Sequence, residues 1–173
     1  TKEAIQALNS RGIVTKMFTG DNKKAAKQIA EELGISEFAA EMLPDQKYSK
    51  LEKELEKYKG TNGKVAFVGD GINDSPVLAR ADVGISMGGV GSGSAIEASD
   101  IVVMTDSIDR IECAIDISKK TSKIIKQNLI FSIGVKIVVL ILSVFGVANI
   151  WEAVFADVGA TLITVLNSLR ILK

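Results

Sequence analysis

Two carboxylates follow a short apolar run in the segment Lys64-Val-Ala-Phe-Val-Gly-Asp-Gly-Ile-Asn-Asp-Ser-Pro76. The run 65–68 is typical of a parallel strand buried on both faces, and the glycines beside Asp70 allow a sharp turn. Asp74 follows near the start of a predicted helix that has Pro76 in its first turn. Both carboxylates therefore lie where open α/β sheets bind ligands, and they can converge on a hard cation such as Mg²⁺. The alternative is that Asp70 serves only the turn and Asp74 only caps the helix.

A second predicted strand, 14–18, ends in Thr19-Gly20-Asp21-Asn22 and runs into an amphipathic helix that stops at Gly34. At such a strand tip, the Thr19 hydroxyl and free backbone N–H groups can hold a phosphate oxygen. The alternative is an ordinary helix N-cap at Thr19 or Asp21.

A third segment, Pro44-Asp45-Gln46-Lys47, places a cation just inside another amphipathic helix; taken alone, Lys47 indicates only surface charge. Together the three segments resemble the phosphorylation domain of P-type ATPases, a branch of the haloacid dehalogenase fold. The matching motifs, in family order, are Thr19-Gly20-Asp21-Asn22, Pro44-Asp45-Gln46-Lys47 and Gly69-Asp70-Gly71-Ile72-Asn73-Asp74-Ser75-Pro76.

This resemblance implies two functions for the motif residues. Asp70 would bind Mg²⁺, and Asn73 and Asp74 would support that site. The residues implied at the phosphoryl group are Thr19, Gly20, Asp21 and Lys47. Phosphoryl transfer asks a protein mainly to position groups and to neutralise charge on the phosphoryl oxygens, and a cation, a metal and a hydroxyl meet that need.

The nucleophile of that family, the Asp of an Asp-Lys-Thr-Gly-Thr sequence, does not occur in the 173 residues. We therefore expect the chain to be the C-terminal part of a longer pump, inactive alone, with ATP bound mainly by an upstream domain. One alternative is a truncated membrane fragment without turnover. Another is a membrane-tethered haloacid-dehalogenase-like phosphatase, which needs an Asp-x-Asp at its first strand tip; no Asp-x-Asp occurs here.

Charge divides the chain into two parts. The net charge is zero, but residues 114–173 hold seven Lys or Arg against three Asp or Glu, a balance of +4 that leaves −4 for residues 1–113. Only Lys136 is charged from 128 to 150 and only Asp157 from 153 to 169, so each run approaches the ~20 residues that span a bilayer. The alternative is a pair of buried helices in a soluble protein.

Basic residues flank these two apolar runs on one side. They are Lys119, Lys120, Lys123, Lys126, Arg170 and Lys173. By the positive-inside rule, both ends of the hairpin lie in the cytoplasm.

Lys136 and Asp157 are ionisable residues at membrane depth, where a charge is expensive and indicates an ion pathway or a paired site. At 1.5 Å per residue their levels differ by only about 6 Å in a ~30 Å core, so we predict that they pair when no ion is bound. Two helices after the phosphorylation domain resemble the heavy-metal branch of P-type ATPases. Asp157-Val158-Gly159 with Lys136 resembles its zinc, cadmium and lead exporters, which implies that Asp157 binds the transported ion and Lys136 is its counter-ion.

We expect residues 1–113 to form the C-terminal part of an α/β phosphorylation domain with a parallel, haloacid-dehalogenase-like sheet. Residues 114–173 are expected to form a membrane hairpin, with helices at about 124–148 and 150–170. A helix that begins near Ser107 is expected to continue into the hairpin. The expected strands are 14–18, 38–40, 64–68, 83–86 and 101–104.

The expected partners are the lipid bilayer, the upstream remainder of the pump and a divalent heavy-metal ion, with no nucleic acid. The expected location is the plasma or cytoplasmic membrane, with residues 1–113 in the cytoplasm. Because the chain has no histidine and one cysteine, it offers neither an imidazole zinc site nor a CxxC pair. We expect Cys113 to be an ordinary thiol that is at least half-buried.

Overall fold

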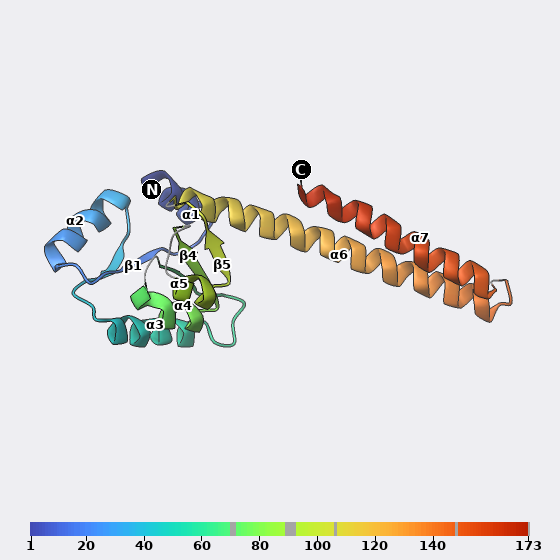
Figure 1. The fold of residues 1–173 in the computed structure, drawn as a ribbon, viewed down its shortest axis with the longest axis horizontal. Coiled ribbons are helices and arrows are strands. Elements are labelled where there is room, and N and C mark those ends of the chain that lie inside the picture. Colours follow the sequence, from blue (N-terminus) through green and yellow to red (C-terminus); the bar gives the residue numbers. More distant parts are fainter. Residues whose placement is uncertain (70–71, 89–92, 106, 148, 173) are drawn as a thin grey trace. The chain divides into compact units, whose positions relative to one another are not determined.

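The computed structural model describes residues 1–69, 72–88, 93–105, 107–147 and 149–172 (Figure 1). Two positions singled out from the sequence, Asp70 and Lys173, lie outside these ranges. Internal contacts divide the chain into two compact units, Thr1–Glu112 and Cys113–Lys173, and each is described by itself.

Strands and helices alternate in the first unit, as the sequence predicts. The helices are α1 (Lys2–Ser10), α2 (Lys23–Leu33), α3 (Pro44–Tyr58), η1 (Ile72–Asp74), α4 (Ser75–Arg80) and α5 (Gly93–Ala98). The strands are β1 (Lys16–Phe18), β2 (Glu37–Ala39), β3 (Ala66–Gly69), β4 (Val83–Met87) and β5 (Ile101–Val103). Every strand lies within about two residues of its predicted range, so the apolar runs were sufficient to find them.

All strand pairs are parallel, but the strands form two sheets instead of one. β1 pairs with β2, with Met17 opposite Phe38, and the second sheet has the order β3-β4-β5, with Val68 opposite Ile85. Within the described residues, β1 and β3 therefore each pair along one edge only. A strand between them would join the two sheets, and no described segment of this chain takes that place.

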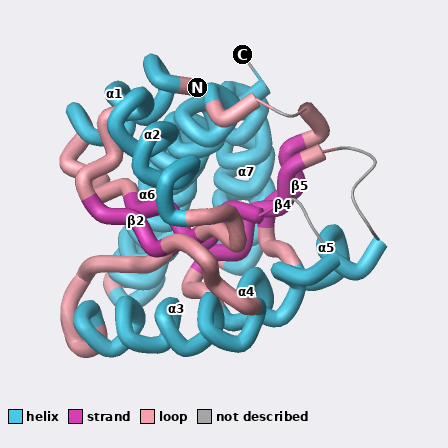
Figure 2. Tube along the Cα trace, turned by 90° about the vertical axis from the view of Figure 1, so that its left-hand side faces the viewer, coloured by secondary structure: helices cyan, strands magenta, loops and turns pink. Residues whose placement is uncertain are grey.

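Helices cover the strands on two sides, as parallel sheets require because both of their faces are apolar. Figure 2 shows α1 and α2 on one side of the strands and α3 and α4 on the other. The most deeply buried large side chains on the α3 and α4 side are Leu51, Val77 and Leu78. The core of this unit therefore lies between α3, α4 and the second sheet.

Helix α3 is tied to the first sheet by a largely buried ion pair. The Lys16 ammonium on β1 lies 3.0 Å from the Glu54 carboxylate on α3 and 2.6 Å from that of Glu37 on β2. Hydrogen bonds to Glu37 and Glu54 raise the pKa of Lys16. Burial alone would raise the pKa of Glu54, but hydrogen bonds from Lys57 and Lys16 outweigh burial and lower it.

The second unit is built from two helices and a short terminal turn. Helix α6 (Asp109–Val144) begins in the last residues of the first unit and continues without a break, and α7 (Ile150–Ser168) is followed by η2 (Leu169–Leu172). Both α6 and the segment Ile150–Leu172 are long and apolar enough to cross a membrane, by length and composition. The most apolar stretch of α6 has no buried residue, which argues against a helix pair in a soluble core.

Cys113 contradicts the sequence-based expectation, because its thiol is exposed. Ile111, which is 7% exposed, takes the buried side of this helical turn instead. A residue two positions further along an α-helix points to a different side, since each residue turns the helix by about 100°.

Gly84 on β4 allows α4 to pack directly on the second sheet. A Cβ atom at this position would lie 2.5 Å from the Leu78 carbonyl oxygen and 3.0 Å from its carbonyl carbon, both of them backbone atoms. Gly84→Ala should therefore lower the free energy of unfolding by about 1–3 kcal/mol, as overpacking does. Thermal denaturation followed by circular dichroism tests this, with Gly93→Ala as the control because its added Cβ meets open space; equal melting temperatures for both variants would contradict it.

The Glu54 ion pair should make stability depend on pH. The folded-state pKa of Glu54 lies below the ordinary glutamate value of 4.5, so its stabilisation is present above that pH and is lost as the pH falls further. Glu54→Gln should cost about 1–3 kcal/mol near pH 7, the worth of a hydrogen bond to a charged group. The cost should shrink below about pH 4.5. Urea denaturation at pH 7 and pH 4 measures it, and a cost that does not change with pH would contradict the ionic role.

Candidate functional site

Lys47 and Asp74 meet between α3 and the end of β3. Helix α3 starts with Pro44, and the Gln46 side chain accepts a hydrogen bond of 3.0 Å from the Leu43 N–H, which fixes the first turn. Lys47 follows in this turn, and its Nζ atom donates a hydrogen bond of 2.9 Å to Asp74 Oδ1. The two side chains are only 16% and 13% exposed. Lys47 is therefore not the surface charge that it resembles when its segment is considered alone.

Asp74 ends η1 and occupies the N-cap position of α4, but its side chain makes no capping hydrogen bond. The carboxylate lies instead over Gly69, where a Cβ atom would stand 3.3 Å from Asp74 Oδ2. Asn73 precedes it with an exposed side chain. The interpretation of Asp74 as a simple helix cap is therefore wrong, while Asp70, the other predicted carboxylate, lies outside the described residues.

Thr19 lies at the end of β1 and is held by its neighbours along the chain. Its Oγ1 atom donates to Asp21 Oδ2 at 2.8 Å and accepts from the Asp21 N–H at 3.1 Å. The N-cap of α2 is Asn22, whose side chain accepts from the backbone, so neither Thr19 nor Asp21 caps that helix. The Thr19 carbonyl accepts from the Met42 N–H at 3.1 Å, which ties this strand tip to the segment that leads to Lys47. Gly20 lies close to that segment as well, since its Cβ would be 3.4 Å from the Met42 carbonyl oxygen.

The hairpin holds a second pair of opposite charges. Lys136 Nζ on α6 lies 3.3 Å from Asp157 Oδ1 on α7, so the pairing predicted from their depths is present. The two side chains are 67% and 58% exposed within the described chain. The Asp157 carbonyl also accepts a hydrogen bond from the Thr161 hydroxyl, one turn along α7.

A polar contact between the same two helices was not predicted from the sequence. Asn128 Nδ2 donates to Ser168 Oγ at 2.9 Å and to the Thr164 carbonyl at 3.2 Å, and Asn167 Nδ2 donates to Asn128 Oδ1 at 2.8 Å. These hydrogen bonds set the register of α6 against α7. The available signal was an Asn at the start of one apolar run and an Asn near the end of the other, because a hairpin brings these positions to one level.

The chain is similar to known proteins over nearly its whole length. A sequence profile of haloacid dehalogenase-like hydrolases matches residues 1–82. The chain is 50% identical, over 99% of its length, to the cadmium, zinc and cobalt-transporting ATPase of Bacillus subtilis (strain 168). It is 46% identical over the same share to the zinc-transporting ATPase of Synechocystis sp. (strain ATCC 27184 / PCC 6803 / Kazusa). The chain belongs to the heavy-metal P-type ATPases.

The structural similarity covers the chain equally well. The crystal structure of a zinc-transporting PIB-type ATPase in the E2.Pi state superposes with a TM-score of 0.89 at 36% identity, over 99% of this chain and 27% of that one. The chain spans 24% of the length of each of the two curated relatives. These matches favour a segment of a heavy-metal P-type ATPase over a tethered phosphatase or an inactive fragment.

Members of this family use Mg²⁺ and ATP, and the residues at the β3 tip fit the metal. Asp74 offers a carboxylate and Asn73 an amide oxygen, which are the hard donors that Mg²⁺ takes together with water and phosphate oxygens. Among the described residues there is no group of three or more His, Cys, Asp or Glu side chains that could hold a metal ion. Such a closed site is not needed for Mg²⁺, because this ion usually keeps several waters.

Proposed function

We propose that this chain is the C-terminal segment of an ATP-driven pump that exports divalent heavy-metal ions of the zinc, cadmium and lead class. The observation that carries the proposal is the Lys136–Asp157 pair at 3.3 Å in a hairpin that continues from a haloacid-dehalogenase-like unit. Asp157 binds the transported ion, and Lys136 neutralises the carboxylate when the ion is absent. The two relatives, a cadmium, zinc and cobalt-transporting ATPase and a zinc-transporting ATPase, support this class of ion.

In the first unit, Lys47 and Thr19 hold the phosphoryl group, with Gly20 and Asp21 shaping the Thr19 turn. The Lys47 ammonium is already positioned by Asp74 at 2.9 Å, so little reorganisation is needed when phosphoryl oxygens arrive. Asp70, Asn73 and Asp74 hold Mg²⁺. Bound there, Mg²⁺ supplies positive charge for the phosphoryl oxygens.

The phosphorylated aspartate comes from a strand upstream of this chain, and we place that strand between β1 and β3. Both strands are parallel members of their sheets and have one unpaired edge within the described residues. The Lys47–Asp74 contact joins the α3 side to the tip of β3, so an aspartate at the tip of an inserted strand would meet Thr19, Lys47 and Asp74 together. ATP is bound mainly by the upstream domain.

The pump lies in the plasma or cytoplasmic membrane, with residues 1–113 in the cytoplasm. The basic residues before α6 enters its apolar stretch support this orientation, since cytoplasmic flanks carry an excess of Lys and Arg. The phosphate site then faces the compartment that contains ATP.

Lys47→Gln in the full-length pump should reduce metal-dependent ATP hydrolysis roughly 10²-fold, the usual effect of removing one electrostatic contact to the reacting group. Lys50→Gln is the matched control, because Lys50 is an exposed lysine on the same helix. Its activity should stay close to that of the parent protein. Equal activities of the two variants would contradict the phosphoryl role of Lys47.

Asp157→Asn should abolish the stimulation of ATP hydrolysis by Zn²⁺, Cd²⁺ and Pb²⁺, because the amide carries no charge to bind them. Phosphorylation by inorganic phosphate in the absence of metal should persist, which separates loss of the ion site from misfolding. Glu152→Gln removes a carboxylate at the start of the same helix and should keep metal stimulation. An Asp157→Asn protein with unchanged metal affinity, or a parent protein stimulated best by Cu⁺, would overturn the assignment.

A further inference from the structure

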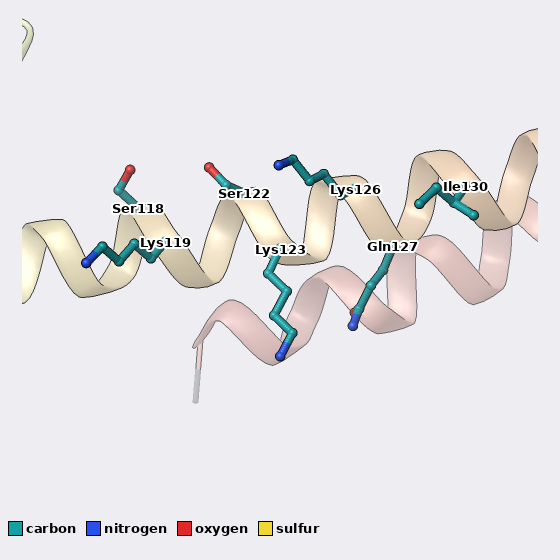
Figure 3. Close-up of a pocket in the computed structure, with 7 residues that line it drawn as sticks. All are labelled: Ser118, Lys119, Ser122, Lys123, Lys126, Gln127 and Ile130. Carbon is teal, nitrogen blue, oxygen red and sulfur yellow. The ribbon is translucent and has the colours of Figure 1, made fainter. Parts of the chain in front are cut away.

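Helix α6 has a basic hollow just before its apolar stretch. The hollow is lined by Ser118, Lys119, Ser122, Lys123, Lys126, Gln127 and Ile130. Three of these residues carry ammonium groups, two carry hydroxyls, and none is acidic. Figure 3 shows Ser118, Ser122 and Lys126 along one side of the helix and Lys123 and Gln127 along the other, so the hollow lies between two polar rims.

A second hollow continues from the first and is apolar. It is lined by Ile130, Phe131, Gly134, Val135, Val138 and Val139 of α6 and by Ala156 of α7. Ile130 lines both hollows and is 72% exposed. We call the two shallow hollows, joined at Ile130, the groove; it is basic at one end and apolar at the other.

The dimensions of this groove match one leaflet of a bilayer. From Ile130 to Val139 the helix rises about 14 Å, close to half of a ~30 Å hydrocarbon core. Lys126 precedes Ile130 by roughly 6 Å, within the headgroup layer that adds ~5–8 Å on each side of the core, and Lys123, roughly 10 Å before Ile130, lies at the outer border of that layer. Lysine side chains reach readily along such an interface.

We propose that this groove binds one anionic phospholipid of the cytoplasmic leaflet. The phosphate lies between Lys123 and Lys126, with the Ser122 hydroxyl and Lys119 beside it, and one acyl chain lies along Ile130, Gly134 and Val138. Charge complementarity selects an anionic headgroup, and the apolar continuation selects a lipid over a free phosphate ion. The proposal rests on the proposed membrane placement of the hairpin.

Gly134 keeps the apolar part of the groove open. A Cβ atom at this position would meet nothing within 4 Å, so a larger side chain enters the groove without a backbone clash. Gly134→Leu therefore fills the position of the acyl chain and leaves every lysine in place. Lys123→Gln with Lys126→Gln does the reverse, because it removes the headgroup charges and leaves the apolar groove unchanged.

The test measures lipid retention by the full-length protein, purified from vesicles of phosphatidylcholine and phosphatidylglycerol and analysed by native mass spectrometry. The parent protein should retain one phosphatidylglycerol, preferred at least tenfold over phosphatidylcholine. The double lysine variant and Gly134→Leu should each reduce that retention at least fivefold. Lys120→Gln, an exposed lysine outside the groove, and Ile137→Phe, added bulk outside the groove, should leave it unchanged.

Several outcomes would overturn the proposal. No retained phosphatidylglycerol on the parent protein would mean that another part of the pump fills the groove. If Lys120→Gln lowered phosphatidylglycerol retention equally, the effect would come from the overall positive charge of the helix and not from the groove. If millimolar inorganic phosphate displaced the lipid and Gly134→Leu left phosphatidylglycerol retention unchanged, the site would bind phosphate and not a lipid. Lipid retention is measured without turnover, so a protein that binds the lipid but transports no metal would refute the proposed function alone.

Discussion

Helix α3 is the element on which the first unit depends, because its charged side chains connect the two sheets. In its first turn Lys47 binds Asp74 near the tip of β3, and two turns further along Glu54 binds Lys16 of β1. A further ion pair, between Glu52 and Arg80, fixes α3 against α4. The pairs at Glu54 and Asp74 are largely buried, so losing one partner would strand a charge in a poorly solvated place. The positions of the strand tips relative to Lys47 are therefore set by electrostatics as well as by packing.

In the membrane hairpin, too, charged side chains lie where water is scarce. A lone charge among apolar residues is expensive, so Lys136 and Asp157 are tolerated because each neutralises the other. The two helices must keep a fixed register for this pair to form. The hydrogen bonds of Asn128 with Asn167 and Ser168, near the end of the hairpin that lies away from its turn, hold that register. Small side chains around Asp157, among them Gly159 and the buried Ala160, leave room for the two helices to lie close together.

The sequence predicted what depends on local pattern and missed what depends on distant partners. Apolar runs and glycines located all five strands, and the spacing of Lys136 and Asp157 predicted their contact. Lys47 taken alone indicated surface charge, because nothing in its own segment reveals that Asp74 will lie 2.9 Å away. The split into two sheets was missed for the same reason, since strand alternation indicates parallel pairing but not which edges lack a partner. The groove has no sequence motif, because its lining residues recur at helical spacing along α6 and do not form a continuous segment.

The Lys47–Asp74 and Lys136–Asp157 pairs differ in which charges take over when a ligand separates the two side chains. At Lys47 and Asp74, an anion and a cation arrive together in the proposed reaction, so each side chain finds a new opposite charge. In the proposed transport only a cation arrives at Lys136 and Asp157, and Lys136 is then left with a positive charge beside a divalent ion. From residue 128 onward this chain offers just two acidic side chains, Glu152 and Asp157, and Glu152 is engaged by the backbone of Asn149. Under the proposed function, the remaining negative ligands for the ion come from other membrane helices of the pump, and Asp157 supplies one ligand among several.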